Sequence, residues 1–204
     1  MVDRLIAEEL QADLGSVVIG REIIVLERTG STNDAILQIA NANPKEGLVV
    51  FAEHQTAGRG QHGNRWESAA GKGLWFSILL QPKIDLASSP RLTTWAAEAI
   101  AGAMQSEFSL TPTIKPPNDV QIDGRKVAGV LVEMRAREKA PHLAVAGIGV
   151  NMNQSREDFP KALQPTAISL ATALGKPVDR QSFAIVLLRN LDRTYWEKFA
   201  STGL

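Results

Sequence analysis

The spacing of apolar and polar residues divides the chain into alternating helices and strands. Apolar side chains that recur every three to four positions are typical of helices. They predict helices over residues 3–14, 31–41, 89–108, 167–174 and 180–199. Short runs rich in β-branched and aromatic residues indicate strands instead. Such runs cover residues 22–28, 48–53, 74–80, 112–115, 119–134 and 142–150, and the run over 119–134 is predicted to fold into a hairpin that turns at Asp123–Gly124.

This order of elements predicts the fold class. The strict strand–helix–strand alternation of a parallel sheet is missing, and several predicted strands follow one another through short turns. We therefore expect an α+β protein with a single mixed, largely antiparallel sheet flanked by helices. Since the chain has no internal repeat, low-complexity tract or linker, we expect one domain over residues 1–204.

Composition narrows the function classes. The chain contains no cysteine, which excludes disulfides, thiolate metal sites and cysteine nucleophiles. Twenty-two Lys and Arg balance twenty-two Asp and Glu, and a net charge of zero argues against a general nucleic-acid or anionic-membrane binder. Because no apolar run is long enough for a signal peptide or a membrane span, we expect a cytoplasmic protein.

The stretch over residues 55–73 is the most unusual part of the chain. It has no helical or strand periodicity and carries five glycines, which are Gly58, Gly60, Gly63, Gly71 and Gly73. The first three fit the dinucleotide fingerprint G-x-G-x-x-G, but no helical pattern opens at them, which argues against a Rossmann site. A solvated surface loop and a ligand-binding loop both remain open, and loops this long in compact domains are usually functional or disordered.

Charge within this stretch favours the ligand-binding interpretation. Residues 57–73 contain the cations Arg59, Arg65 and Lys72 against the single carboxylate of Glu67. Cations with free backbone N–H groups suit phosphate or carboxylate, and the neighbouring Trp66 suits a base or ring. An anionic ligand with an aromatic part, such as a nucleotide, is therefore predicted.

Polar groups also gather at four predicted strand ends. They are Ser31-Thr32-Asn33, the segment IKPPNDV (114–120), Lys126 with Gly129, and the segment GIGVNMN (147–153). Each has a structural alternative, since Ser31 or Thr32 can simply cap a helix and the others can be turns or solvated strand ends. Four such ends beside a glycine-rich loop are harder to explain as packing alone.

Taken together, these residues resemble the biotin protein ligase family. The matching motifs occur in order and cover residues 31 to 153, and they are STN (31–33), EHQTAGRGQHGNRW (53–66), KPPND (115–119), KVAGVLVE (126–133) and GIGVNMN (147–153). The resemblance implies the biotin/lipoate ligase fold, which is similar to that of class II aminoacyl-tRNA synthetases. It also implies an ATP-dependent ligase that forms biotinyl-5′-AMP and transfers biotin to a lysine of a biotin carboxyl carrier protein.

The resemblance assigns roles to individual residues. Biotin would be bound by Ser31, Thr32, Asn33, Gln55, Arg59, Gly60, Gln61 and Lys126, of which the first four contact the ureido ring. Nucleotide would be bound by Gly58, Trp66, Asn118, Asp119 and Asn151, with Trp66 against adenine. Lys126, Arg59 and Lys115 would carry the catalytic charge. Mg²⁺ would accompany ATP, and no metal site built by the protein alone is expected.

Departures from the family pattern qualify these roles. Gln61 and Asn64 stand where many members have arginine, and Pro116 replaces a tryptophan. Because Gln61 removes one cation from the loop, we expect the protein to retain the adenylate less tightly. Arg65 or Lys72 could supply the missing positive charge. The 30 residues before the first motif predict one helix and one strand, so no DNA-binding domain is expected, and the small C-terminal β-barrel of the family is expected to be absent or truncated.

Two alternatives to biotin ligation stay open from the sequence. A lipoate ligase or acyltransferase of the same fold is the nearest enzymatic alternative. A non-catalytic biotin-binding or sensing module is the other, and it is suggested by Gln61 and by the expected absence of the C-terminal domain. A homodimer is compatible with every one of these interpretations.

Overall fold

A seven-stranded mixed sheet forms the centre of the described part of the chain. The computed structural model describes residues 4–15, 18–40, 44–138 and 141–200. Its strands are β1 (Glu22–Thr29), β2 (Leu48–Gln55), β3 (Gly73–Leu80), β4 (Thr113–Lys115), β5 (Asp119–Ile122), β6 (Arg125–Arg135) and β7 (Leu143–Asn151). They are ordered β1-β2-β3-β7-β6-β5-β4, and only the β1–β2 pair is parallel. The predicted α+β fold with a mixed, largely antiparallel sheet is confirmed.

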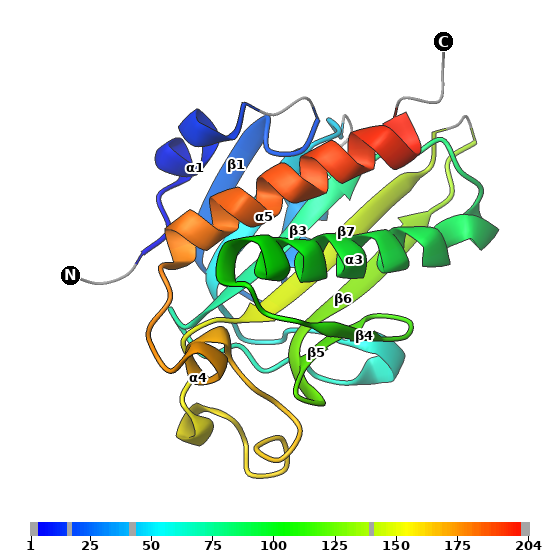
Figure 1. Ribbon diagram of the computed structural model, residues 1–204. Helices are drawn as coiled ribbons and strands as arrows, with labels where there is room; N and C mark the ends of the chain where they lie inside the picture. Colours follow the sequence, from blue (N-terminus) through cyan, green and yellow to red (C-terminus); the bar gives the residue numbers. More distant parts are fainter. Residues whose placement is uncertain (1–3, 16–17, 41–43, 139–140, 201–204) are drawn as a thin grey trace.

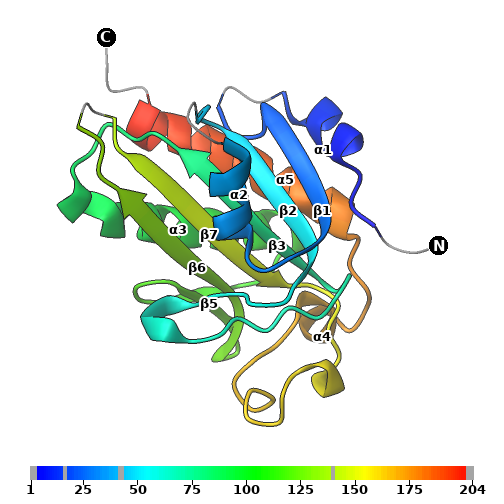
Figure 2. The same cartoon turned by 180° about the vertical axis from the view of Figure 1, so that it is seen from behind.

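Helices cover the two faces of the sheet unequally. The helices are α1 (Ala7–Leu14), α2 (Thr32–Ala40), α3 (Ser89–Phe108), α4 (Leu170–Leu174) and α5 (Arg180–Tyr195). The long helices α3 and α5 lie across one face (Figure 1), and α2 lies against the other (Figure 2). No described helix is both long and apolar enough to cross a membrane.

Alternation along the strands explains this two-sided packing. Phe51 and Phe76, which pair across β2 and β3, lie in the large core under α3 and α5. Val50 and Leu79 point to the opposite face and form a smaller core with Ile36 of α2. Because side chains alternate between faces, one strand supplies both cores.

The face that carries α2 is not covered by helix along its whole length. At the end of β3 where Gly73 lies, the segments over residues 56–72 and 152–169 cross the molecule as loops (Figure 2, turquoise and yellow to orange). Loops placed on a rigid sheet in this way commonly carry binding and catalytic groups.

Most predicted elements are confirmed, but the first helix and the helix expected from residue 167 begin later than predicted. The first helix begins at Ala7 because Leu5 N donates to the Glu53 carboxylate and Ile6 hydrogen-bonds the Gln181 amide through both backbone groups. The helix expected from residue 167 begins at Leu170, and the last α-helix ends at Tyr195 and continues as a π-helical turn, Trp196–Ala200. The ends expected at residues 3 and 41 lie outside the described residues.

The predicted hairpin turn is also confirmed. Asp123 and Gly124 join β5 to β6 with positive φ values of 50° and 72°. Positive φ at both central residues is what a two-residue hairpin loop with a type I′ turn requires. The turn before β5 contains a cis peptide bond between Pro116 and Pro117.

Candidate active site

Glycines form the floor of the site. Gly129 on β6 pairs directly with Gly149 on β7, and Gly147 lies two residues further along the same face. A Cβ atom on Gly149 would lie 2.4 Å from the indole of Trp66, and one on Gly147 would lie 2.3 Å from Asn33 Oδ1. The two glycines of the GIG motif are therefore required because other side chains rest on the strand at these positions.

Gly149→Ala tests this packing. The added methyl group would push Trp66 off the sheet, and overpacking of this kind costs about 1–3 kcal/mol. We expect the free energy of unfolding in urea to fall by that amount. Gly30→Ala is the matched control, because a Cβ at Gly30 meets no described atom within 4 Å. Equal stability of the Gly149 variant and wild type would contradict the packing described here.

The glycine-rich segment folds back on itself as a short hairpin. Trp66 N donates to Gly58 O over 2.9 Å, and Gly60 N donates to Asn64 O over 2.7 Å. The turn at its tip is a 3₁₀ helix, Gln61–Gly63. Gly58 is needed because a Cβ there would lie 2.6 Å from Trp66 O. The lack of periodicity predicted a loop, and the structure shows which backbone hydrogen bonds order it.

A first cavity opens between this hairpin, the start of α2 and the glycine floor. Many of the residues predicted from the sequence line it together, namely Ser31, Thr32, Asn33, Gln55, Arg59, Gly60, Trp66, Asn118 and Lys126. The first four are buried. The predicted gathering of polar groups from separate strand ends is thus present in the fold.

Buried hydrogen bonds hold the inner wall of this cavity. Gln55 Oε1 accepts from Thr32 N over 2.8 Å and from Thr32 Oγ1 over 3.1 Å. Gln55 Nε2 donates to Ser68 Oγ over 3.2 Å, and Ser77 Oγ lies 2.8 Å from Thr32 Oγ1. The Thr32 hydroxyl therefore serves the cavity wall and not the cap of α2. A connected polar network of this kind fixes its side chains before any ligand arrives.

Arg59, which lines the same cavity, is held there by two carboxylates. Arg59 NH2 lies 2.9 Å from Asp34 Oδ1 and 2.9 Å from Glu133 Oε2. The same Glu133 oxygen accepts from Asn33 Nδ2 over 2.6 Å. These contacts join the glycine-rich hairpin to α2 and to β6.

A second cavity adjoins the first. Asn64, Arg65 and Glu67 form one side, and the segment that follows β7 forms the other with Phe159, Leu163, Thr166 and Ala167. Asn151 also lines it. Trp66 and Lys126 line both cavities. The second cavity combines an apolar wall with an indole and cations, which suits a ligand that is aromatic at one end and anionic at the other.

Lys126 is held firmly at the junction of the two cavities. Its backbone N donates to Thr166 O over 2.7 Å and its O accepts from Ile168 N over 3.0 Å, so the segment after β7 pairs with the start of β6. Its Nζ lies 2.6 Å from Asp119 Oδ1 and 5.1 Å from the centre of the Trp66 ring. The ammonium group is therefore positioned by a carboxylate and an aromatic face at once.

Two predicted nucleotide contacts have partners within the protein. Asn118 Nδ2 donates to Val130 O over 3.2 Å. Asn151 Nδ2 donates to Ile168 O over 3.1 Å and to Lys126 O over 3.4 Å, while Asn151 Oδ1 accepts from Gln154 Nε2. In this structure both asparagines brace the backbone around the cavities.

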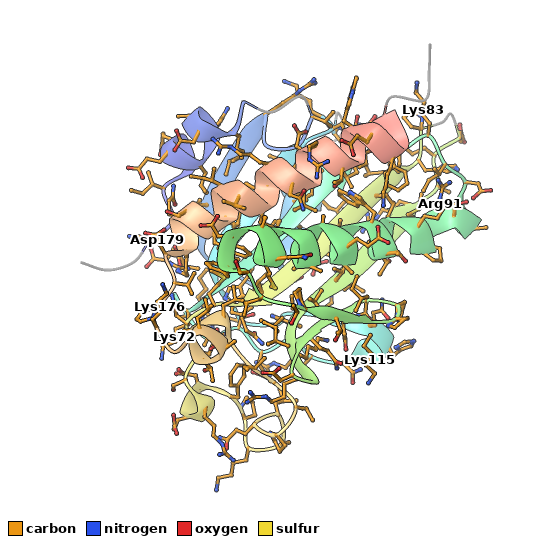
Figure 3. The ribbon with its side chains drawn as sticks, viewed as in Figure 1. Lys72, Lys83, Arg91, Lys115, Lys176 and Asp179 are labelled. Atoms are coloured by element: carbon orange, nitrogen blue, oxygen red, sulfur yellow. The ribbon has the colours of Figure 1, made fainter. Side chains whose placement is uncertain are left out.

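Four further predicted residues lie outside the residues that line the two cavities. Gly58 acts through the hairpin backbone and Asp119 through its ion pair with Lys126. Gln61 lies at the hairpin tip, and Lys115 is an exposed residue at the end of β4 (Figure 3). Direct ligand contacts by these four residues remain predictions.

The expected surplus of positive charge on the glycine-rich segment is offset in the fold. Arg65 Nε lies 3.3 Å from Glu67, and Lys72 Nζ lies 2.5 Å from Asp158. Partial burial opposes ionisation of Asp158, but hydrogen bonds from Lys72 and from the backbone and hydroxyl of Ser155 outweigh it and lower the pKa of Asp158. Glu67 belongs to the segment itself, whereas the carboxylates that pair with Arg59 and Lys72 come from α2, β6 and the segment after β7, which composition within residues 57–73 could not reveal.

Sequence reasoning missed three parts of the site. Ser77 on β3 and Glu133 on β6 organise the first cavity, and the segment over residues 159–167 walls the second. The alternation along β6 could have placed Glu133 on the same face as Gly129. The other two parts depend on contacts between segments that are distant in sequence.

These features define an α+β protein with two adjoining cavities that share one lysine. The pattern that defines the Biotin/lipoate A/B protein ligase family matches residues 25–151, and the chain belongs to this family. The resemblance expected from the motifs is confirmed.

Several relatives within this family bear functional names. The bifunctional ligase/repressor BirA of Bacillus spizizenii is 36% identical over 192 residues, which cover 94% of this chain and 59% of the relative. The biotin–[acetyl-CoA-carboxylase] ligase of Paracoccus denitrificans is 32% identical, with coverage of 80% and 68%. The biotin protein ligase of Aquifex aeolicus, solved in complex with biotin and ATP, has a TM-score of 0.72 and 29% identity, with coverage of 87% and 73%. The chain thus spans about 59% of the length of the first of these relatives.

Proposed function

We propose that the protein is an ATP-dependent biotin ligase that forms biotinyl-5′-AMP and transfers biotin to a lysine of a carrier protein. One observation carries this proposal: a polar cavity and a cavity with an apolar and aromatic wall share Lys126 and Trp66. A carboxylate bound in the first cavity and a phosphate bound in the second would meet at a single ammonium group. The names of the relatives and of the Aquifex aeolicus structure support biotin and ATP as the two substrates.

The first step joins the two substrates. A carboxylate oxygen of biotin attacks the α-phosphorus of ATP, the bond to the bridging oxygen breaks, and pyrophosphate leaves. Lys126 Nζ is the group best positioned to offset the charge of both reactants, with Arg59 at the cavity mouth as a second cation. Preorganised donors of this kind stabilise a phosphoryl-transfer transition state more than water does.

The second step consumes the mixed anhydride. The amine of the acceptor lysine attacks the biotinyl carbonyl carbon, an amide bond forms, and AMP leaves with the electron pair. The glycine-rich hairpin and the segment after β7 flank the two cavities, and their closure over the intermediate would limit its hydrolysis. We propose that the acceptor is the biotin carboxyl carrier domain of a carboxylase, as the name of the Paracoccus denitrificans relative suggests.

Mg²⁺ is proposed to arrive with ATP. Among the described residues, no group of three His, Asp or Glu side chains is arranged to hold a metal ion. Mg²⁺ is commonly held by substrate phosphates together with one or two carboxylates or carbonyls. Asp119, whose Oδ1 lies 2.6 Å from Lys126 Nζ, and Asn151, which lines the second cavity, are the candidates for this role.

A homodimer, a cytoplasmic location and the absence of nucleic-acid binding remain predictions from the sequence. Light scattering at several protein concentrations tests the first of these. A gel-shift assay with duplex DNA at low salt tests the last.

Adenylate formation tests the proposed function. Purified protein would be incubated with labelled ATP and either biotin or lipoate, and pyrophosphate and adenylate would be measured. We expect both products with biotin alone. The same products with lipoate alone would indicate a lipoate ligase, and tight biotin binding without pyrophosphate release would indicate a sensing module.

Gln61→Arg tests the main departure from the family pattern. An added cation at the hairpin tip would form a charge-assisted hydrogen bond with the adenylate phosphate, which contributes about 1.5–3 kcal/mol. We expect release of biotinyl-5′-AMP to slow by about tenfold or more, measured by filtration after a single turnover. His62→Arg adds the same charge one residue further along the tip, and we expect little change there. An unchanged release rate in the Gln61 variant would contradict this interpretation.

A further inference from the structure

We propose that Glu133 is a positioning residue of the biotin cavity, which sets the orientation of the Asn33 amide and holds Arg59 across the cavity mouth. This inference rests on the proposed function and extends it to Glu133, the last residue of the KVAGVLVE motif, to which the sequence analysis assigned no role. Glu133 lies on β6, four residues beyond Gly129 on the same face of the sheet.

One oxygen of Glu133 joins two cavity side chains. Oε2 accepts from Asn33 Nδ2 over 2.6 Å and from Arg59 NH2 over 2.9 Å. Asn33 belongs to α2 and Arg59 to the glycine-rich hairpin, so the carboxylate connects three elements that are distant in sequence. Asn33 is 3% exposed, whereas the side chain of Glu133 is 36% exposed, so the hydrogen bond between them is partly buried.

The carboxylate determines which way the Asn33 amide faces. An ionised carboxylate can only accept hydrogen bonds, so Asn33 must turn its NH₂ group toward Glu133. Asn33 Oδ1 then lies 2.6 Å from Ser77 Oγ and packs against Gly147. Without an acceptor oxygen at position 133, the amide could rotate and present the opposite pattern of donor and acceptor.

The orientation of the Asn33 amide also affects the hydrogen bonds of the other side chains in the inner wall. The Ser77 hydroxyl has one proton and lies within hydrogen-bond distance of both Asn33 Oδ1 and Thr32 Oγ1. Thr32 Oγ1 in turn donates to Gln55 Oε1. A reversed Asn33 amide would therefore change the hydrogen bonds available to a ureido ring, which needs both donors and acceptors in fixed places.

The second contact of Glu133 acts on the hairpin. Arg59 is the first cation of the glycine-rich hairpin, and its guanidinium binds Glu133 and Asp34 with equal distances of 2.9 Å. Both contacts draw the hairpin over the cavity that Arg59 lines. Asp34 and Glu133 both bind Arg59. Among the described hydrogen bonds, the one from the Asn33 amide goes to Glu133.

Asp34 therefore provides a matched control. Glu133→Ala removes the partner of both Asn33 and Arg59, whereas Asp34→Ala removes a partner of Arg59 alone. Glu133→Gln keeps an acceptor oxygen near the same position and should rescue much of the loss. Glu133→Met has a similar length but no acceptor, so it separates hydrogen bonding from packing.

Calorimetry with biotin, steady-state kinetics and trypsin cleavage would distinguish these roles. We expect biotin to bind about tenfold more weakly to Glu133→Ala and Glu133→Met, which corresponds to the loss of one partly buried hydrogen bond to a charged group. The KM for biotin should rise in parallel, with kcat changed by less than about threefold. Asp34→Ala should change biotin affinity by less than about threefold, yet cleavage after Arg59 should accelerate in both Asp34→Ala and Glu133→Ala.

Three outcomes would overturn the proposal. These are wild-type biotin affinity in Glu133→Met, an equal loss of affinity in Asp34→Ala, and a Glu133→Gln variant as weak as Glu133→Ala. Failure of the wild-type protein to bind biotin would instead reject the proposed function. Urea denaturation of each variant ensures that a loss of affinity is not a loss of folded protein.

Discussion

Replacement of Lys126 by alanine is expected to slow adenylate formation by about 10²-fold or more, the usual effect of removing one preorganised transition-state donor. Lys126 lines both cavities, and its ammonium group lies between the carboxylate of Asp119 and the face of Trp66. Both reactants of the first step are anions. Without this cation, their mutual repulsion and the charge of the transition state would be offset mainly by Arg59.

The assay for this variant is single-turnover formation of biotinyl-5′-AMP at saturating substrates. Lys83→Ala is the control, since Lys83 is an exposed residue beyond the far end of β3, away from Lys115 and the site (Figure 3). We expect wild-type rates for it. Near-normal adenylation in Lys126→Ala would reject the role assigned to this lysine.

Lys115→Ala belongs in the same experiment. The family resemblance predicts that Lys115 adds catalytic charge, but its exposed position at the end of β4 is outside the residues that line the cavities. A loss as large as that of Lys126→Ala would mean that the β4–β5 turn closes onto the ligand. A small loss would limit Lys115 to long-range attraction of anionic substrates, which would weaken with salt.

Local pattern was sufficient to predict most of the fold. The elements follow from apolar spacing, and the hairpin at Asp123–Gly124 follows from turn chemistry. The predicted start of the first helix was too early, because the side chains of Glu53 and Gln181 bind the backbone of residues 5 and 6. Those partners lie 48 and 175 residues away in sequence, beyond the reach of any local rule.

For the site, too, local sequence patterns identified part of the structure, and contacts between distant residues were missed. Motif residues that line the first cavity were found because they stand at predicted strand ends or in the glycine-rich segment. The residues that orient them were missed, and Asn33 and Glu133 are 100 residues apart while Lys72 and Asp158 are 86 apart. The local surplus of positive charge was likewise offset by carboxylates from other elements.

Arg180 is the clearest case of a residue that only the fold makes important. It is the first residue of α5 and is fully buried. Its NH1 donates to Glu53 Oε2 over 2.8 Å and to Gly73 O over 3.1 Å. Glu53 Oε1 accepts from Leu5 N, and Glu53 O accepts from Gly71 N. The ion pair thus ties α5 to both the N-terminal segment and the end of the glycine-rich segment.

Arg180→Met is expected to lower the free energy of unfolding by about 3–5 kcal/mol, because it leaves the Glu53 carboxylate buried without its cation. Urea denaturation followed by circular dichroism measures this change. Arg193→Met on the same helix is the control, since Arg193 forms an exposed pair with Glu197, and such pairs contribute about 0.3–0.5 kcal/mol.

The double variant Arg180→Met with Glu53→Gln separates the buried charge from the lost contacts. A glutamine at position 53 keeps an acceptor for Leu5 N but carries no charge, so the double variant should be more stable than Arg180→Met alone. If the two variants were equally unstable, the cost would come from lost packing and the lost hydrogen bond to Gly73. If the double variant is more stable than Arg180→Met, the loss in Arg180→Met comes mainly from the unpaired charge of Glu53. A neutral pair of similar volume could then replace Arg180 and Glu53 without a large loss of stability.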